Sequence, residues 1–201
     1  MKISVRPLWA PISGETPIDD VSELIPQNIQ LRADLNLVES DNIAQVFAKY
    51  LVGRFAPIQF DMAWVKSLHK EMFCDVWKWA GRLRDHTLNI GSHPHQIEAE
   101  LLSLMEDVAV WQFSNQYPLI VSAATLHHRA VKIHPFINGN GRWSRMLANV
   151  YMKMHGGNPT QWPEPTMGAV SDIREAYIHA VKAADAGDMK PLVKLHYDYA
   201  V

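Results

Sequence analysis

The chain has 201 residues, of which 48% are hydrophobic and 20% charged, with 19 Lys and Arg against 21 Asp and Glu. This length and composition predict one globular domain, and the near-neutral charge argues against a strongly basic nucleic-acid binder. The apolar runs are shorter than the ~20 residues of a membrane span, and the N-terminus has no signal-peptide core. The single cysteine, Cys74, leaves no intrachain disulfide, which fits a reducing cytoplasm.

Residues 1–33 are rich in proline and predict an irregular N-terminal arm, followed by a single domain over residues 34–201. Helical spacing of apolar residues begins near Asp34 and stops at Gly53. Asp61 is expected to cap the next helix.

The helical rhythm breaks over residues 82–96, where Thr, Leu and Ile favour extended structure and Gly and Pro favour turns. A small β-hairpin flap is expected near residues 86–95. Further helices are expected over residues 97–114, from Pro118 to Ile133, from Arg142 to His155, and over residues 171–185 and 189–199. The prediction is an all-α bundle of about seven to eight helices.

One long segment contains no acidic residue. Residues 108–163 include five Lys or Arg and four His but neither Asp nor Glu. Such a bias is typical of a surface that faces an anion, although two mostly buried helices would also carry few charges.

Within that segment, the loop Asn138-Gly139-Asn140-Gly141 leads into a helix whose first turns carry Arg142 and Arg145. A helix N-terminus already has partial positive charge and free N–H groups, and no acid is near in the sequence. The two arginines therefore have an unmet demand for negative charge, which phosphate would satisfy. His134 precedes the loop and could take a proton from an attacking hydroxyl, while Phe136 is expected to anchor the loop in the core.

The segment HPFINGNGR-WSR, residues 134–145, closely resembles the Fic signature His-x-Phe-x-(Asp/Glu)-Gly-Asn-Gly-Arg-x-x-Arg. WKWAGRLRDHTLNIG, over residues 77–91, is similar to the segment that leads into the Fic flap. TPIDD, LIPQNI and LNLVESDNI are similar to the Fic subgroup called mobile mystery protein B. The resemblance extends from about residue 16 to residue 195 and implies the all-α Fic fold.

This resemblance implies transfer of AMP from ATP to a Ser, Thr or Tyr hydroxyl of a target protein, with release of pyrophosphate. His134 would deprotonate the hydroxyl, and Arg142 and Arg145 would hold the β- and γ-phosphates. The phosphate cradle would comprise the backbone of Gly139, Asn140 and Gly141, with help from the Asn140 side chain. The flap that docks the target would comprise Leu88, Asn89, Ile90 and Gly91.

Two positions depart from the family pattern. Asn138 stands where most active members have the Asp or Glu that binds Mg²⁺ or Mn²⁺, and its amide oxygen brings no charge to a metal ion. The inhibitory sequence (Ser/Thr)-x-x-x-Glu-(Gly/Asn) is absent, although Ser67…Glu71 and Ser171…Glu175 keep its first spacing. The subgroup resemblance implies a helix-turn-helix companion, so an inhibitor could also be a separate protein.

Three other functions compete with this one. Ten histidines could indicate zinc, but there is no His-Glu-x-x-His, and His127 and His128 diverge around a helix. The acid-free segment could face nucleic acid, but the tryptophans outside it are spaced like core residues rather than a base-stacking platform. The third is a non-catalytic or altered-donor Fic-like module that acts through a partner protein, which Asn138 favours.

Overall fold

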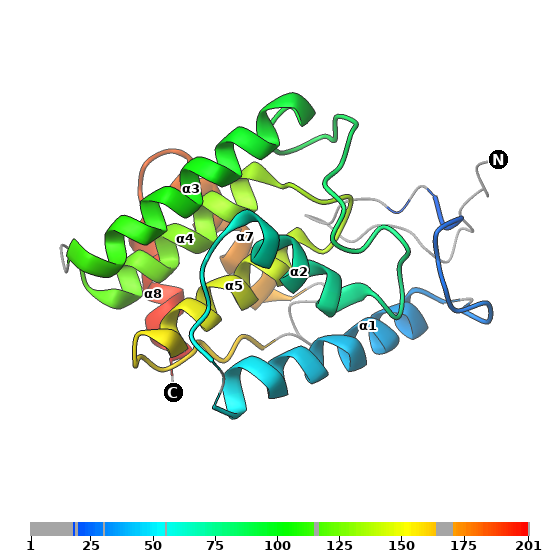
Figure 1. Ribbon diagram of the computed structural model, residues 1–201, viewed down its shortest axis with the longest axis horizontal. Helices are drawn as coiled ribbons and strands as arrows, with labels where there is room; N and C mark the ends of the chain where they lie inside the picture. The colour runs from blue at the N-terminus through cyan, green and yellow to red at the C-terminus, as the bar shows by residue number, and fades with distance from the viewer. Residues whose placement is uncertain are drawn as a thin grey trace.

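The computed structural model describes residues 18, 20–29, 31–54, 56–114, 117–163 and 171–200. These residues contain seven α-helices, one π-helical segment and isolated β-bridges without a sheet, so the all-α prediction is confirmed. The elements, shown in Figure 1, are α1 (Arg32–Phe47), η2 (Ala48–Val52), α2 (Met62–Phe73), α3 (Pro94–Ser114), α4 (Leu119–Ile133), α5 (Asn140–Met154), α7 (Asp172–Asp185) and α8 (Lys190–Asp198). None of these helices is both long enough and apolar enough to cross a membrane.

Local capping signals explain where several helices begin. The Asp61 carboxylate accepts a hydrogen bond from the Trp64 N–H at 2.8 Å, which confirms the predicted cap of α2. α4 begins directly after Pro118, as expected. The Ser171 hydroxyl accepts from the Arg174 N–H at 3.2 Å and starts α7. At the first helix, α1 continues into η2 and the helical backbone ends before Gly53.

α5 lies at the centre of the bundle, and it packs against α4 more extensively than any other two elements pack (Figure 1). Every residue from Trp143 to Met152 is buried, and α2 and η2 cover other sides of the helix. A helix that is covered all round is a core element. The core therefore fixes α5 in position, including its N-terminus, where the loop from α4 arrives.

The small hairpin predicted near residues 86–95 does not form. α3 already begins at Pro94, and the residues before it have no strand partner. The backbone of this segment is bound to the end of α4 instead. The Arg84 N–H donates to the Pro135 carbonyl at 3.0 Å, and the Ser92 N–H donates to the Ile133 carbonyl at 3.1 Å. These two contacts attach the chain on either side of residues 85–91 to the end of α4 and the turn after it.

Most of the predicted N-terminal arm lies outside the described residues. In its described part, Leu24 forms an antiparallel bridge with Trp77, and the Lys78 N–H donates to the Glu23 carbonyl at 3.0 Å. These contacts attach residues 20–29 to the turn after α2. The division into an arm over residues 1–33 and a domain over 34–201 stays a prediction.

The last two described helices, α7 and α8, have a small apolar core of their own. It comprises the buried side chains of Ala180, Ala184 and Leu192, surrounded by Tyr177, Val181, Met189 and Leu195. This cluster is separate from the main core, which the earlier helices form. The contact between this pair of helices and α4 therefore depends on other side chains, which are described below.

Candidate functional site

His134 lies at the end of α4, where the chain turns sharply out of the helix. It has a left-handed backbone (φ 53°), the one non-glycine residue with positive φ among the described residues. A left-handed residue at a helix C-terminus reverses the chain direction, and glycine is usual there because other residues are strained. The surrounding contacts therefore have to hold His134 in this conformation.

Arg84 supplies those contacts, and the sequence analysis missed it. Its buried guanidinium donates to four backbone carbonyls, among them His134 at 2.7 Å and His86 at 2.9 Å. The carbonyls of Ser92 and Ile133 are the other two acceptors. Burial lowers the pKa of Arg84 from its usual value. One side chain thus attaches the loop before α3 to the turn at His134.

The predicted flap residues divide into two groups. Gly91 lies directly on the turn, because a Cβ atom built on it would be 2.5 Å from His134 Cβ and 2.9 Å from Arg84 Nη2. Its φ of 93° also requires glycine. Leu88 is half-buried, whereas Asn89 and Ile90 are exposed. The structure therefore brings Gly91 against His134 and leaves the preceding residues at the surface.

The His134 imidazole is buried and stays neutral at physiological pH. Burial, and then the nearby charge of Arg84, lower its pKa to about 4. Its Nδ1 lies 3.3 Å from the Val131 carbonyl, which only accepts hydrogen bonds, so Nδ1 carries the proton. Nε2 consequently carries the lone pair, and a neutral imidazole of this tautomer accepts a proton at Nε2.

The loop after His134 is held by its own side chains. Phe136 is fully buried, which confirms its expected role as an anchor. The Asn140 side chain accepts from the Phe136 N–H at 2.9 Å and donates to the Phe136 carbonyl at 2.8 Å. Both polar ends of this amide are thus used inside the loop. Asn140 acts here on the shape of the loop, and its expected side-chain contact with phosphate stays a prediction.

His69, on α2, is a second residue that the sequence analysis missed. Its ring stacks on Phe136 with 3.6 Å between centroids. Its Nδ1 accepts from the Gly81 N–H at 3.0 Å, and its Nε2 donates to the Asn138 carbonyl at 3.0 Å. Burial lowers the pKa of His69 to about 3, so the ring is neutral. The His69 imidazole thus joins α2 to the loop that follows His134.

The start of α5 requires glycine at position 139. Gly139 has φ 77°, and a Cβ atom there would lie 2.5 Å from the Phe73 ring. Its N–H donates to the Asn138 side-chain oxygen at 2.6 Å. That oxygen is the group that a metal ion would use, and the loop already engages it. Mg²⁺ is usually held by one or two carboxylates together with substrate phosphates, and the amide of Asn138 brings no carboxylate to this position.

Arg142 has a partner that its local sequence does not reveal. Its Nη1 donates to Glu39 of α1 at 2.7 Å, and its guanidinium lies 4.9 Å from the centre of the Phe73 ring. The buried Glu39 carboxylate also accepts from Trp77 Nε1 at 2.7 Å. The predicted unmet demand for negative charge is therefore wrong at Arg142, because an acid 103 residues away supplies the charge.

Arg145 is buried beside two aromatic rings. Its guanidinium carbon lies 5.3 Å from the centre of the Tyr177 ring and 5.9 Å from that of Trp162. If a side chain were added to Gly141, its Cβ would lie 3.5 Å from Arg145 Nη1, which places this cation against the first turn of α5. The side chains of Arg142 and Arg145 thus extend from the same helix and contact different neighbours.

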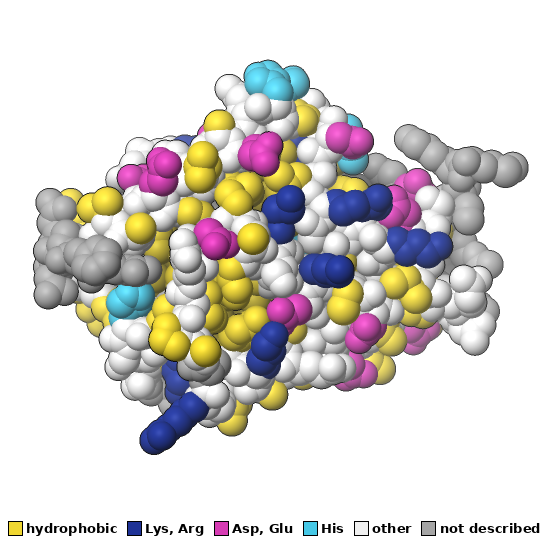
Figure 2. Space-filling model, viewed as in Figure 1, with side chains coloured by type: hydrophobic (Ala, Val, Ile, Leu, Met, Phe, Trp, Pro, Cys, Tyr) yellow, Lys and Arg dark blue, Asp and Glu magenta, His cyan; other side chains and the backbone are white. Residues whose placement is uncertain are grey.

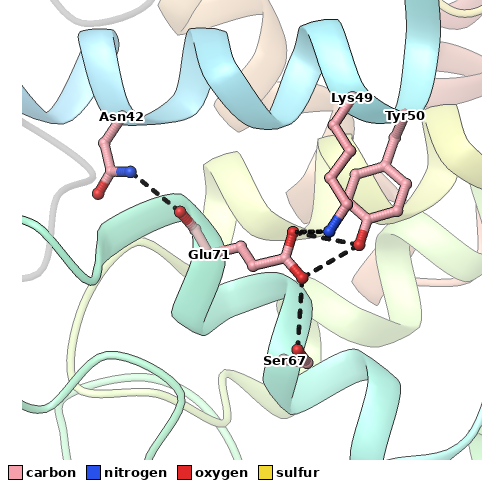
Figure 3. Close-up of polar contacts among 5 residues, drawn as sticks. All are labelled: Asn42, Lys49, Tyr50, Ser67 and Glu71. Carbon is pink, nitrogen blue, oxygen red and sulfur yellow. Dashed lines mark hydrogen bonds and ion pairs between the residues drawn. The ribbon is translucent and has the colours of Figure 1, made fainter. Parts of the chain in front are cut away.

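Ser67 and Glu71, one of the two pairs with inhibitory-motif spacing, lie on α2 and face α1 and η2 (Figure 3). Glu71 accepts from Lys49 Nζ at 2.8 Å and from the Tyr50 hydroxyl at 3.1 Å. Asn42 donates to the Glu71 backbone carbonyl at 3.0 Å. These contacts fix α1 on α2, and so they hold Glu39 in place opposite Arg142.

The charged side chains on the face shown in Figure 2 are mixed in sign. Several Lys and Arg side chains lie near one another in the middle and right of this view, with Asp, Glu and apolar side chains around them. Among the described residues there is also no group of three or more His, Cys, Asp or Glu that could bind a metal ion.

Residues 59–152 match the sequence profile of the Fic/DOC family. A curated relative, the protein adenylyltransferase Fic of Drosophila willistoni, is 32% identical over 121 residues, which are 59% of this chain and 23% of the relative. The chain thus spans about a quarter of the length of the curated relatives that it matches.

Two solved structures show the same fold. The N-terminal Fic domain of Bep8 from Bartonella sp. 1-1C aligns with a TM-score of 0.70 and 17% identity over 92% of each chain. BepC from Bartonella tribocorum, with bound AMPPNP, aligns with a TM-score of 0.66 and 18% identity over 86% of this chain and 89% of that one. The predicted Fic fold is confirmed, and the mobile mystery protein B subgroup stays a prediction.

Gly139→Ala should destabilise the protein more than Gly156→Ala. Both glycines have nearly the same positive φ, 77° and 75°, but only Gly139 lacks space for a Cβ. The shared backbone strain costs about 1–2 kcal/mol, and the contact with Phe73 adds roughly 1–3 kcal/mol at position 139. Urea unfolding of both variants measures the difference. Equal losses would contradict the packing described for Gly139.

The free energy of unfolding should fall as the pH is lowered from about 6.5 to 4. His69 and His134 have pKa values of about 3 and 4 in the folded protein, against 6.5 for an exposed ring. The unfolded chain therefore binds protons in this range that the folded protein does not, at about 1.4 kcal/mol per pH unit and ring. Urea titrations at several pH values test this, and His69→Gln should flatten the slope. A stability independent of pH would disprove the neutral, buried state of these rings.

Proposed function

Because the chain contains a Fic domain, we propose that it is a nucleotidyltransferase that moves AMP from ATP to a Ser, Thr or Tyr hydroxyl of a protein target. The observation that carries the proposal is the neutral imidazole of His134 at the turn into the N-terminus of α5, whose first turns carry Arg142 and Arg145. The curated relatives named protein adenylyltransferase Fic support the same activity.

In the proposed reaction, one group of residues neutralises the charge of the phosphates and another residue accepts the proton. The N-terminal N–H groups of α5, at Asn140 and Gly141, bind the phosphates together with Arg142 and Arg145. The target hydroxyl oxygen forms a bond to the α-phosphorus, the bond from that phosphorus to pyrophosphate breaks, and His134 Nε2 takes the hydroxyl proton. Positioning and charge neutralisation are the main requirements of such a transfer.

The loop before α3 is the proposed docking site for the target. Arg84 and Gly91 hold it against His134, while Asn89 and Ile90 are exposed beside that contact. An extended target segment that pairs with this exposed backbone would place its hydroxyl near the imidazole. No step is assigned to magnesium, and a metal ion held by Asn138 stays a prediction of the sequence.

The Glu39–Arg142 ion pair favours a second candidate function. While Glu39 holds Arg142, that guanidinium has to exchange partners before it binds a phosphate. Asn138 likewise provides no negative charge for a metal ion. These two features support a weak or non-catalytic Fic-like module that acts through a partner protein, for example a helix-turn-helix companion.

Labelling with α-³²P-ATP in a bacterial lysate tests the primary proposal. The parent protein should transfer label to a protein band, and His134→Ala should abolish transfer, because the proton acceptor is lost while the phosphate contacts persist. ATP binding and thermal unfolding of both proteins serve as controls. Equal labelling by parent and variant would refute the role of His134, and no labelling by a parent that binds ATP would favour the second candidate.

Glu39→Gln should strengthen ATP binding roughly tenfold, because Arg142 then loses a charged competitor for the phosphate. Glutamine keeps an oxygen for Trp77 Nε1, so the fold of α1 should be preserved. Isothermal titration of ATP into both proteins, with melting temperatures as the control, measures the effect. If a folded Glu39→Gln protein bound ATP no better than the parent, Glu39 would not compete with phosphate for Arg142.

A further inference from the structure

A chain of buried hydrogen bonds joins the C-terminal helices to the site helices. The Tyr177 hydroxyl of α7 lies 3.0 Å from His127 Nε2 of α4. His127 Nδ1 lies 3.0 Å from His196 Nε2 of α8. His196 Nδ1 lies 2.9 Å from the Thr160 hydroxyl. Four side chains from separate segments therefore form one continuous path.

This path is ordered along its whole length. Burial lowers the pKa values of His127 and His196, the latter to about 4, so both rings are neutral. A neutral imidazole has one donor and one acceptor nitrogen, so every hydrogen bond in the path points the same way. At the far end, the Thr160 backbone is clamped by the Asn149 amide of α5 through two hydrogen bonds of 2.9 Å. Both ends of the path thus have fixed partners.

Arg145 lies at the Tyr177 end of this path. The Tyr177 ring packs under the guanidinium, and Trp162 approaches the same ring edge-on, with 5.9 Å between centroids. His127 also stacks on the Tyr177 ring, with 5.6 Å between the two centroids. An arginine side chain has many rotamers, and an aromatic ring under its guanidinium restricts them while keeping the charge.

We propose that Tyr177 is a positioning residue for Arg145, and that the His127–His196 pair holds the Tyr177 ring in place for that purpose. The inference rests on the proposed function and assigns the β-phosphate to Arg145. Its consequence is specific: Tyr177 contributes to the preference for a nucleotide with a β-phosphate over AMP, although Tyr177 itself contacts no phosphate.

The test compares the affinities of ADP and AMP, measured by isothermal titration on the full chain. Arg145→Gln should weaken ADP binding and leave AMP binding as it is. Tyr177→Leu, which removes the ring, should lower the ADP-to-AMP affinity ratio roughly fivefold to tenfold. Tyr177→Phe keeps the ring but loses the bond to His127, so its ratio should lie between those of the parent and Tyr177→Leu.

Tyr197→Leu is the matched control, since Tyr197 is an exposed tyrosine on α8 and should not change the ratio. A purely structural role of Tyr177 would alter the melting temperature, or both affinities equally, and would leave the ratio unchanged. That result overturns the inference. If Tyr177→Leu does not fold, Tyr177→Phe decides: a lower ratio supports the inference, and the parental ratio overturns it.

The two proposals fail in different ways. If Arg145→Gln leaves the ADP-to-AMP ratio unchanged, Arg145 does not bind the β-phosphate, and both the assigned phosphate role and the positioning role are wrong. If Arg145→Gln lowers the ratio and both Tyr177 variants keep it, the phosphate role stands and only the positioning role is wrong.

Discussion

The buried guanidinium of Arg84 joins two segments that lie 50 residues apart, and the geometry of the site depends on this contact. The carbonyl oxygens at the end of α4 need hydrogen-bond donors. The Arg84 guanidinium donates to these oxygens and also to carbonyl oxygens of the loop before α3. His134 is thereby held in a left-handed conformation that the chain alone would resist. The same side chain fixes the loop that precedes α3, so the imidazole and the proposed docking loop keep one relative position.

The charge balance around the site follows from burial. Several histidine and arginine side chains near the loop are buried or half-buried, where an unpaired charge is costly. The protein meets this cost in two ways: His69 and His134 are neutral because burial lowers their pKa values, whereas Arg142 is charged and paired with Glu39. In the proposed function, phosphate binding at Arg142 is therefore an exchange of partners, because Glu39 has to release the guanidinium first.

The features that can be predicted from the sequence are those that depend on interactions between residues close together in the chain. The helix starts at Asp61, Pro118 and Ser171 follow from capping and backbone geometry that act within a few residues. The motif from His134 to Arg145 is contiguous, so the sequence alone predicts a candidate site on one loop and one helix. The structure brings Gly91, one of the four predicted flap residues, against His134, and the docking role of this segment stays a prediction.

The contacts that sequence reasoning missed are long-range. Arg84 lies in an extended segment with no periodicity to mark it as buried. His69 and Glu39 did leave a signal, because each occupies a core position of its helix, with Val65 and Met72 near one and Leu35 and Val46 near the other. A polar residue on an apolar helix face predicts a buried partner, but its identity depends on which helix packs there, and the sequence does not state that.

The separate small core of α7 and α8 has a consequence for motion. A helix pair whose apolar core is separate from the main core can open without disrupting that core, so amide hydrogens of α7 and α8 should exchange with solvent before those of α5. Such an opening would separate Tyr177 from Arg145, because Tyr177 lies on α7 and Arg145 on α5. A nucleotide whose phosphate binds Arg145 would shift this opening equilibrium. The stability of α7 and α8 would then depend on whether the site holds a nucleotide, although neither helix contacts the phosphate.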